Sequence, residues 1–249
     1  GTYSDSGCTN KVQELTTDSN GYAKSKALVA GTYYLKEIKA PNKYVISNKV
    51  HTLTVKAGQT SGVTATDKEQ LGAITICKEG EVLSGWNGSN FTYEKKYLPG
   101  AIFKVTAGAD IYKADGTKVY NKDDVIKEAV TTGIDGKVIV TDLHLGTYVV
   151  IETGTIDGYT INTTPQTVDI QYKDQTVDIQ YEATSIYNTR QKGQVSVVKK
   201  DSDTENPLDG GKYTLYAAND IKNYAGSVIV TKGTALQTVT TGENGVAAY

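Results

Sequence analysis

The sequence lacks methionine and has only two cysteines, four prolines, one tryptophan and two phenylalanines among its 249 residues. No apolar run approaches the roughly eighteen residues of a transmembrane helix. The net charge is −2 with no basic cluster, which argues against nucleic acid as a partner and against electrostatic attachment to a membrane. No signal peptide stands at the N-terminus, and the lack of methionine suits an exposed, oxidising location.

Cys8 and Cys77 do not form the pattern of a disulfide framework. We expect two unpaired thiols, with a disulfide between repeats as the alternative. Helical periodicity is also missing, because the best candidate, 123–130, makes at most about two turns. The abundant residues are tyrosine, at 18, and glycine, at 25, together with threonine and valine. This composition predicts an all-β protein of short strands joined by tight turns.

Internal repeats organise the chain. The turn sequences TTDSNG, TTGIDG and TTGENG begin at Thr16, Thr131 and Thr240. A glycine-threonine-tyrosine strand follows the first two turns at Gly31 and Gly146, so these two copies are a constant 115 residues apart. Regular recurrence of this kind is typical of tandem domains.

Two further anchors complete the repeat unit: GAITICKEG at Gly72 matches GQVSVVKKD at Gly193, 121 residues later, and LPGAIFKV matches LDGGKYTLY. Short strands with turns about every 8–12 residues predict an Ig-like β-sandwich in each unit. We expect a first repeat at 1–69 without its opening lysine strand, a complete second repeat at 70–192, and the beginning of a third repeat at 193–249. The chain is therefore interpreted as a fragment of a longer tandem array. The heptapeptide QTVDIQY occurs twice within 165–183, which predicts a hairpin.

Side chains alternate between the two faces of a strand, so every second residue forms a row on one face. In three strands of the second repeat, a polar residue continues such a row of apolar residues. Lys78 follows Ile74 and Ile76, Glu152 follows Tyr148 and Val150, and Asn188 follows Ile186. If these rows face the core, a lysine, a glutamate and an asparagine enter it from three strands. The other repeats hold partial sets: Glu37 and Asp67 in the first, and Lys199, preferred over Lys200 by the 121-residue spacing, in the third.

A buried lysine and glutamate can form an ion pair, which is one expectation. Desolvation also lowers the pKa of a lysine and raises that of a glutamate, so the amine can become a neutral nucleophile and the acid a proton donor. Attack on an asparagine or aspartate side-chain carbonyl then leaves an amide crosslink without any cofactor. Glu37 with Asp67 lacks a lysine in this chain, and Lys199 lacks both partners, so these sites should be unreacted.

GTYYLKEIKAPNKY at 31–44 and GTYVVIETGTIDGY at 146–159 resemble the E-box of Cna protein B-type domains, the Ig-like modules of Gram-positive pilins and collagen-adhesin stalks. ITICK and VSVVK resemble that family's lysine strand, and SIYNTR and VTATDKE its closing strand. The resemblance implies an intramolecular isopeptide bond between Lys78 and Asn188, assisted by Glu152. Two departures lie after the glutamates, at Ile156, where proline is usual, and at Lys43, where glycine is usual.

The resemblance implies a non-enzymatic stalk or pilin-like segment of a cell-wall-attached surface protein, whose signal peptide and anchor lie outside this fragment. Its expected partners are the neighbouring domains of the same chain. The alternative is an adhesive module that binds a host protein or glycan through the insert at 84–97, where Trp86 lies; packing of Trp86 over the end of the sandwich is the simpler expectation. No metal site is expected, because DSNG at 18–21 is a β-turn without the glutamate of a calcium loop. His51 and His144 have no clustered catalytic partners.

Overall fold

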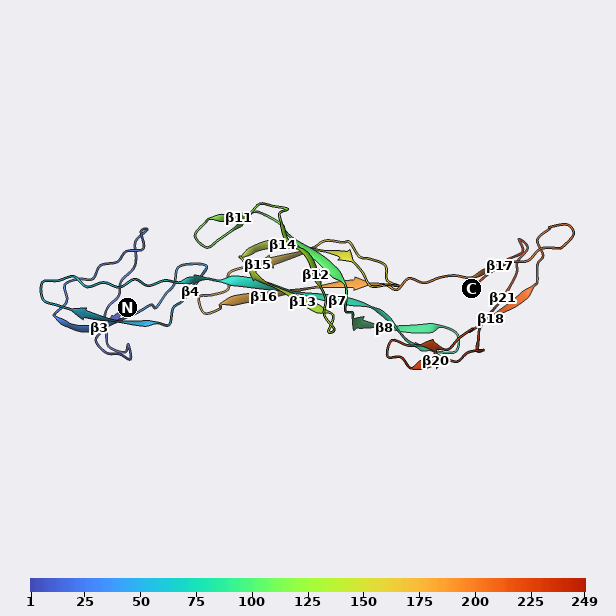
Figure 1. Ribbon diagram of the computed structural model, residues 1–249, viewed down its shortest axis with the longest axis horizontal. Helices are drawn as coiled ribbons and strands as arrows, with labels where there is room; N and C mark the ends of the chain where they lie inside the picture. The colour runs from blue at the N-terminus through green and yellow to red at the C-terminus, as the bar shows by residue number, and fades with distance from the viewer.

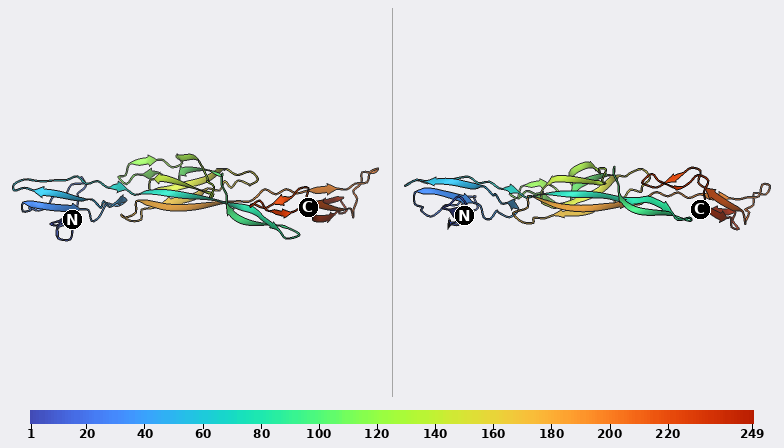
Figure 2. Two further views of the ribbon diagram at one scale, coloured as in Figure 1. Left: turned by 60° about the horizontal axis from the view of Figure 1, so that its bottom comes forward. Right: turned by 90° about the horizontal axis from the view of Figure 1, so that it is seen from below.

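The computed structural model describes residues 1–249, and it forms an elongated rod with the three repeats in line along its long axis (Figure 1). The chain contains strands and turns but no helix, and so no helix that could cross a membrane. The predicted all-β fold of tandem sandwich domains is confirmed. Figure 2 shows the same linear arrangement in two further views, one turned by 60° about the horizontal axis and one from below.

The second repeat is a sandwich of two four-stranded sheets. One sheet has the order β12-β9-β14-β15, and the other has β13-β7-β16 with β8 added along β7. Their bounds are Leu71–Trp86 (β7), Phe91–Tyr97 (β8), Ile102–Ala107 (β9), Val125–Thr131 (β12), Lys137–Leu143 (β13), Gly146–Gly154 (β14), Gln166–Ile170 (β15) and Ile179–Asn188 (β16). A two-stranded hairpin, Ile111–Tyr112 (β10) with Lys118–Tyr120 (β11), projects from this body.

The core of the second repeat lies between the facing rows of these sheets. Its buried side chains come from both sheets and include Ile74, Ile76, Phe103, Tyr148 and Val150, all fully shielded from solvent. Alternation places successive side chains on opposite faces of a strand, so each strand contributes every second residue to this core. The same alternation carries Lys78, Glu152 and Asn188 inward.

Strand β16 runs parallel to β7, whereas the other pairs within the sandwich are antiparallel. Ile186 lies opposite Lys78 in this register, and Asn188 lies opposite Gly80. The last strand of the repeat is thereby hydrogen-bonded along the first. Strands that run in the same direction need a long connection, and here the rest of the domain supplies it.

The hairpin predicted for 165–183 is wrong. The first QTVDIQY copy forms β15, which pairs with β14, while the second copy is mostly a loop that leads into β16 in the opposite sheet. Buried Gln70 fixes this loop: its Oε1 accepts from the Lys173 N–H at 2.9 Å, and its Nε2 donates to the Asp174 and Val177 carbonyls. Long-range contacts with the core and with Gln70 therefore outweigh local pairing of the two copies.

The segment 123–130, our best helical candidate, is not a helix: Asp123 lies in a turn, and residues 125–130 form most of β12. It pairs with β9 in the sandwich, with two register irregularities. Its two apolar half-buried positions, Ile126 and Val130, pack against the core. Sheet formation decides its conformation, as is common where intrinsic propensity is weak.

The first repeat forms one four-stranded sheet of order β2-β1-β3-β5, and a short pair β4–β6 follows towards the second repeat. The bounds are Thr2–Tyr3 (β1), Lys11–Gln13 (β2), Gly31–Lys36 (β3), Tyr44–Val45 (β4), Val50–Val55 (β5) and Lys68–Glu69 (β6). Of residues 63–69, expected to form the closing strand, 63–67 are not in a strand and only Lys68–Glu69 (β6) are. In the second repeat the closing strand pairs with β7, and the first repeat has no strand in that place.

The third repeat consists of three two-stranded pairs: β17–β22, β18–β21 and β19–β20. The bounds are Ser196–Val198 (β17), Lys212–Tyr216 (β18), Ile221–Lys222 (β19), Val228–Val230 (β20), Ala235–Thr240 (β21) and Val246–Ala248 (β22). These pairs correspond to β7–β13, β9–β12 and β10–β11 of the second repeat. Cys8 and Cys77 are both free thiols, so the alternative of a disulfide is wrong.

The repeated turn depends on a glycine with a positive φ. Gly21, Gly136 and Gly245 have φ values of 72°, 69° and 71°, in the left-handed region that favours glycine. At Gly136 an added Cβ would also lie 2.6 Å from the Leu98 backbone nitrogen. This turn thus combines an unusual backbone conformation with a close approach of two chain segments.

We predict that Gly136→Ala lowers the free energy of unfolding by more than about 1 kcal/mol, because both the φ and the contact with Leu98 become unfavourable. Gly116→Ala is the matched control, since its φ is also positive at 88° but nothing lies within 4 Å of its Cβ position. Urea unfolding of both variants measures the difference. Equal losses at the two positions would contradict the role of the close approach.

Candidate functional site

Three polar side chains meet in the core of the second repeat. Lys78 comes from β7, Glu152 from β14 and Asn188 from the end of β16, and each is at most 1% exposed. Charged side chains are almost never fully buried unless they are paired. Here each continues an apolar row of its own strand, so strand periodicity holds it inside.

The glutamate lies between the other two side chains. Lys78 Nζ is 3.4 Å from Glu152 Oε2, and Asn188 Nδ2 donates to Glu152 Oε1 at 2.9 Å. Lys78 Nζ also donates to the Ile186 carbonyl at 3.3 Å. The amine, the carboxyl and the side-chain amide therefore form one continuous polar cluster enclosed by apolar side chains.

Burial changes the ionisation of the amine. Desolvation lowers the pKa of Lys78, and the adjacent Glu152, which favours the charged ammonium, opposes this shift without cancelling it. The neutral, nucleophilic form of Lys78 is therefore more accessible than that of an exposed lysine. This is the electrostatic condition that a reaction of the amine requires.

Two residues that the sequence analysis did not single out complete the cluster. Thr155 Oγ1 accepts a second hydrogen bond from Asn188 Nδ2 at 2.7 Å, and the Asn162 N–H donates to Glu152 Oε2 at 3.0 Å. Asn188 Oδ1 is buried without a hydrogen-bond partner. Both nitrogen-bound protons of the amide are thus held while its oxygen is left free, which is unusual for a buried polar atom.

The first repeat contains half of this arrangement. The Ser47 N–H donates to Glu37 Oε2 at 2.9 Å, and Ser47 precedes Asn162 by the repeat spacing of 115 residues. Burial raises the pKa of Glu37, and the nearby Asp67 carboxyl raises it further. The hydrogen bond from the Ser47 N–H lowers this pKa but does not cancel the rise. The structure thus brings Glu37 and Asp67 together without a lysine. The repeat spacing could have revealed Asn162 from the sequence, but Thr155 corresponds to Ala40 and gave no such signal.

Lys199 matches Lys78 in its backbone contacts. The Lys199 N–H donates to the Gly245 carbonyl and its own carbonyl accepts from Leu208, just as Lys78 does with Gly136 and Leu98. This set of bonds supports Lys199 rather than Lys200 as the equivalent position. The Lys199 side chain is exposed and makes no hydrogen bond or ion pair. No group of three or more His, Cys, Asp or Glu side chains is placed to hold a metal ion.

Comparison with protein families supports the resemblance seen in the sequence. The model of the SpaA prealbumin-like fold domain matches residues 2–69 and 92–185. The chain belongs to this family. The likeness to B-type modules of Gram-positive surface proteins, inferred from the E-box and lysine strands, is thereby confirmed.

Three individual proteins are similar to this chain. A collagen adhesin of Staphylococcus aureus is 33% identical over 129 residues, which cover 51% of this chain and 10% of that protein. The Bacillus anthracis TIE protein has a similar fold, with a TM-score of 0.57 and 23% identity over 95% of this chain and 37% of that chain. BcpA, the major pilin subunit of Bacillus cereus, is 21% identical over 58% of this chain and 36% of its own, with a TM-score of 0.33. The chain thus spans a tenth of the curated relative that it matches.

We predict a pH dependence of stability from the lowered pKa of Lys78. In Asn188→Ala, which keeps the amine and cannot form an amide there, the unfolded state holds the lysine proton up to pH 10.5 while the folded state releases it at a lower pH. Because the unfolded state binds more protons in this window, the free energy of unfolding rises with pH across it, by about 1.4 kcal/mol for each pKa unit of difference. Urea unfolding from pH 7 to 10 measures this rise.

The double variant Lys78→Met, Asn188→Ala is the control for other titrating groups. The pH profile of Asn188→Ala minus that of the double variant isolates the contribution of Lys78. A difference that is flat, or that falls with rising pH, would contradict the direction of the pKa shift.

Proposed function

We propose that this chain is a structural stalk segment of a Gram-positive cell-surface protein, extracellular and attached to the cell wall, whose second repeat is locked by an autocatalytic Lys78–Asn188 isopeptide bond. The observation that carries the proposal is the buried contact of Glu152 with both Lys78 and Asn188. The family and the pilins and adhesin among its relatives are consistent with a mechanical role.

The reaction begins with a proton transfer within the buried pair. The Lys78 ammonium gives a proton to the Glu152 carboxylate, which leaves a neutral amine and a protonated acid in place of two charges in an apolar site. Burial of the Lys78 ammonium favours this exchange because the charge loses its hydration. The lowered pKa of Lys78 has the same cause.

The amine then attacks Cγ of Asn188. A half-turn of the side-chain amide exchanges Nδ2 and Oδ1, so that Oδ1 faces the protonated Glu152 and the Thr155 hydroxyl, the two groups that now hold Nδ2. Both can donate to the negative charge that develops on Oδ1, as an oxyanion hole does. Glu152 holds both reacting groups in one buried cluster, which supplies the effective concentration.

The second half of the reaction expels ammonia. The Lys78 Nζ–Cγ bond forms, the Cγ–Nδ2 bond of Asn188 breaks, and the proton released from Nζ reaches Nδ2 through Glu152. One amide is consumed and one is formed, so no cofactor or oxidant is required. The ammonia takes up the proton that Glu152 gained from Lys78 and leaves as ammonium, so Glu152 returns to its starting carboxylate. The substrate is part of the protein and the reaction occurs once, which distinguishes this chain from an enzyme.

The bond would join the two strands that carry tension through the repeat. Strands β7 and β16 lie side by side and lead to the first and third repeats respectively. Each ladder hydrogen bond contributes only about 1 kcal/mol net. A covalent bond across this pair therefore prevents the strands from separating under force, even when the hydrogen bonds between them break.

We predict that the intact mass of the purified chain is lower than the sequence mass by one ammonia molecule. Lys78→Ala, Glu152→Ala and Asn188→Ala should each restore the sequence mass, and Thr155→Val should slow the reaction because one donor to Oδ1 is lost. Mass spectrometry of freshly purified and incubated samples measures both. Glu37→Ala is the matched control, since its repeat has no lysine partner and the mass deficit should persist.

An adhesive role is the second candidate, and the similarity to a collagen adhesin favours testing it. Trp86 at the end of β7 is partly exposed and packs at 4.7 Å between ring centroids against Phe91. We expect a stalk to bind neither collagen nor host glycans in a binding assay with immobilised ligands. Binding that is lost in Trp86→Ala, but retained in the distant control Tyr22→Ala, would instead support the adhesive role.

A further inference from the structure

The hairpins β10–β11 and β19–β20 occupy equivalent positions in the second and third repeats. Their registers agree: Ile111 pairs with Tyr120 as Ile221 pairs with Val230. Their turns agree as well. The Lys113 carbonyl accepts from the Gly116 N–H, and the Asn223 carbonyl accepts from the Gly226 N–H, so each glycine is the fourth residue of its turn. Ala114 and Tyr224 are therefore the same position, the second residue of a β-turn.

Each of these two residues donates its backbone N–H to the preceding repeat. The Ala114 N–H donates to Glu69 Oε2 at 2.9 Å, and the Tyr224 N–H donates to the Leu83 carbonyl at 2.9 Å. The acceptors differ in chemistry and in sequence, yet the same donor is used at both junctions. We propose that this hairpin is an inter-repeat latch that docks on the preceding repeat and fixes the orientation of consecutive domains.

The acceptor side of the second junction is the insert at 84–97 and the strand before it. This insert extends β7 and β8 into a long hairpin beyond the sandwich, and Figure 1 shows β8 beside β20 of the third repeat. Asn223 Nδ2 adds a bond to the Ser84 carbonyl at 3.4 Å. The β7–β8 hairpin is thus a docking surface for the following repeat. Its partner is the β-turn of β19–β20, whose second residue donates its N–H to the hairpin.

The linker between the second and third repeats is held to the same hairpin. Glu81 Oε2 accepts from the Arg190 N–H at 3.2 Å, and Glu81 Oε1 lies 3.0 Å from Lys192 Nζ. The Lys192 ammonium also lies 4.1 Å from the centroid of the Tyr93 ring. These contacts keep the linker against the second repeat and present the third repeat to the hairpin.

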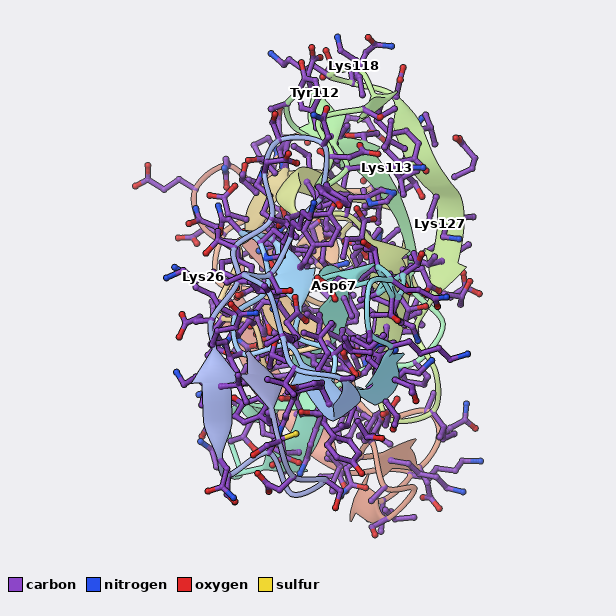
Figure 3. The ribbon with its side chains drawn as sticks, turned by 90° about the vertical axis from the view of Figure 1, so that its left-hand side faces the viewer. Lys26, Asp67, Tyr112, Lys113, Lys118 and Lys127 are labelled. Carbon is purple, nitrogen blue, oxygen red and sulfur yellow. The ribbon has the colours of Figure 1, made fainter.

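The acceptor side of the first junction is Glu69, the last residue of the first repeat, which contacts both repeats. Its backbone pairs with Tyr44 of the first repeat, while its carboxylate contacts Ala114 and, at 2.6 Å, His144 Nδ1 of the second repeat. Gln175 strengthens this junction by accepting from the Ala40 and Ile46 N–H groups. Seen along the rod in Figure 3, Tyr112, Lys113 and Lys118 mark the latch hairpin at the upper edge.

Proline tests the latch at each junction separately. The second position of a β-turn accepts proline readily, so Ala114→Pro and Tyr224→Pro remove the donor and keep the turn. Ala114→Ser and Tyr224→Ala are the matched controls, because both retain the N–H. All four variants are made in the 249-residue chain, and intact mass is recorded for each so that the latch is assessed independently of the crosslink.

We predict that Tyr224→Pro accelerates tryptic cleavage after Lys192 about fivefold, the change expected from losing one hydrogen bond at the junction. Cleavage after Lys68 should stay unchanged in that variant. Ala114→Pro should show the opposite pattern, and the serine and alanine controls should match the unmodified chain. Equal cleavage in proline variants and controls would overturn the proposal.

Amide exchange in the unmodified chain tests the latch without any substitution, so it remains valid even if proline disturbs the hairpin itself. Asp115 and Ala225 follow the two donors directly, and their own N–H groups make no hydrogen bond. In amide exchange of the unmodified chain by NMR, the Ala114 and Tyr224 amides should exchange about fivefold or more slowly than their immediate neighbours. Exchange at the same rate in both pairs would overturn the latch.

Discussion

The parallel pairing of β16 with β7 is the constraint on which the second repeat depends. It places the last strand of the domain along the first and sets Ile186 opposite Lys78. That register brings the Asn188 side chain and the Lys78 amine to the same face of one sheet, where β14 of the facing sheet supplies Glu152. Without this strand pair, the three polar groups would have no common site, and force applied at the two ends would pass through separate parts of the fold.

The chemistry proposed for the site follows from how this fold buries polar groups. A lysine and a glutamate in an apolar core are costly as charges, and the lowered pKa of Lys78 expresses that cost. The Glu152 carboxylate accepts a hydrogen bond from the Asn162 N–H. The side-chain nitrogen of Asn188 donates to Glu152 and to Thr155, while its Oδ1 has no hydrogen-bond partner. The first repeat keeps the carboxyl pair Glu37 and Asp67 but has no lysine side chain paired with it.

Contacts at the junctions hold consecutive repeats together, as contacts within the second repeat hold its strands together. The insert at 84–97 and the loop at 171–178 lie at the two ends of the second repeat and contact its neighbours. A covalent tie within a repeat and a fixed orientation between repeats are complementary. The first resists separation of strands, and the second keeps the load directed along the rod.

The sequence alone determined the repeat, the all-β class and the inward direction of Lys78, Glu152 and Asn188, because strand periodicity and turn chemistry are local. It also located Lys199 and Glu37 by constant spacing. It did not determine how the QTVDIQY copies separate, that 123–130 is a strand, or that 63–67 is not, since these depend on which strands are available as neighbours. Thr155 and the latch donors at Ala114 and Tyr224 were equally hidden. Their roles arise from contacts across the chain, and a backbone N–H carries no signal in the sequence until the tertiary structure gives it an acceptor.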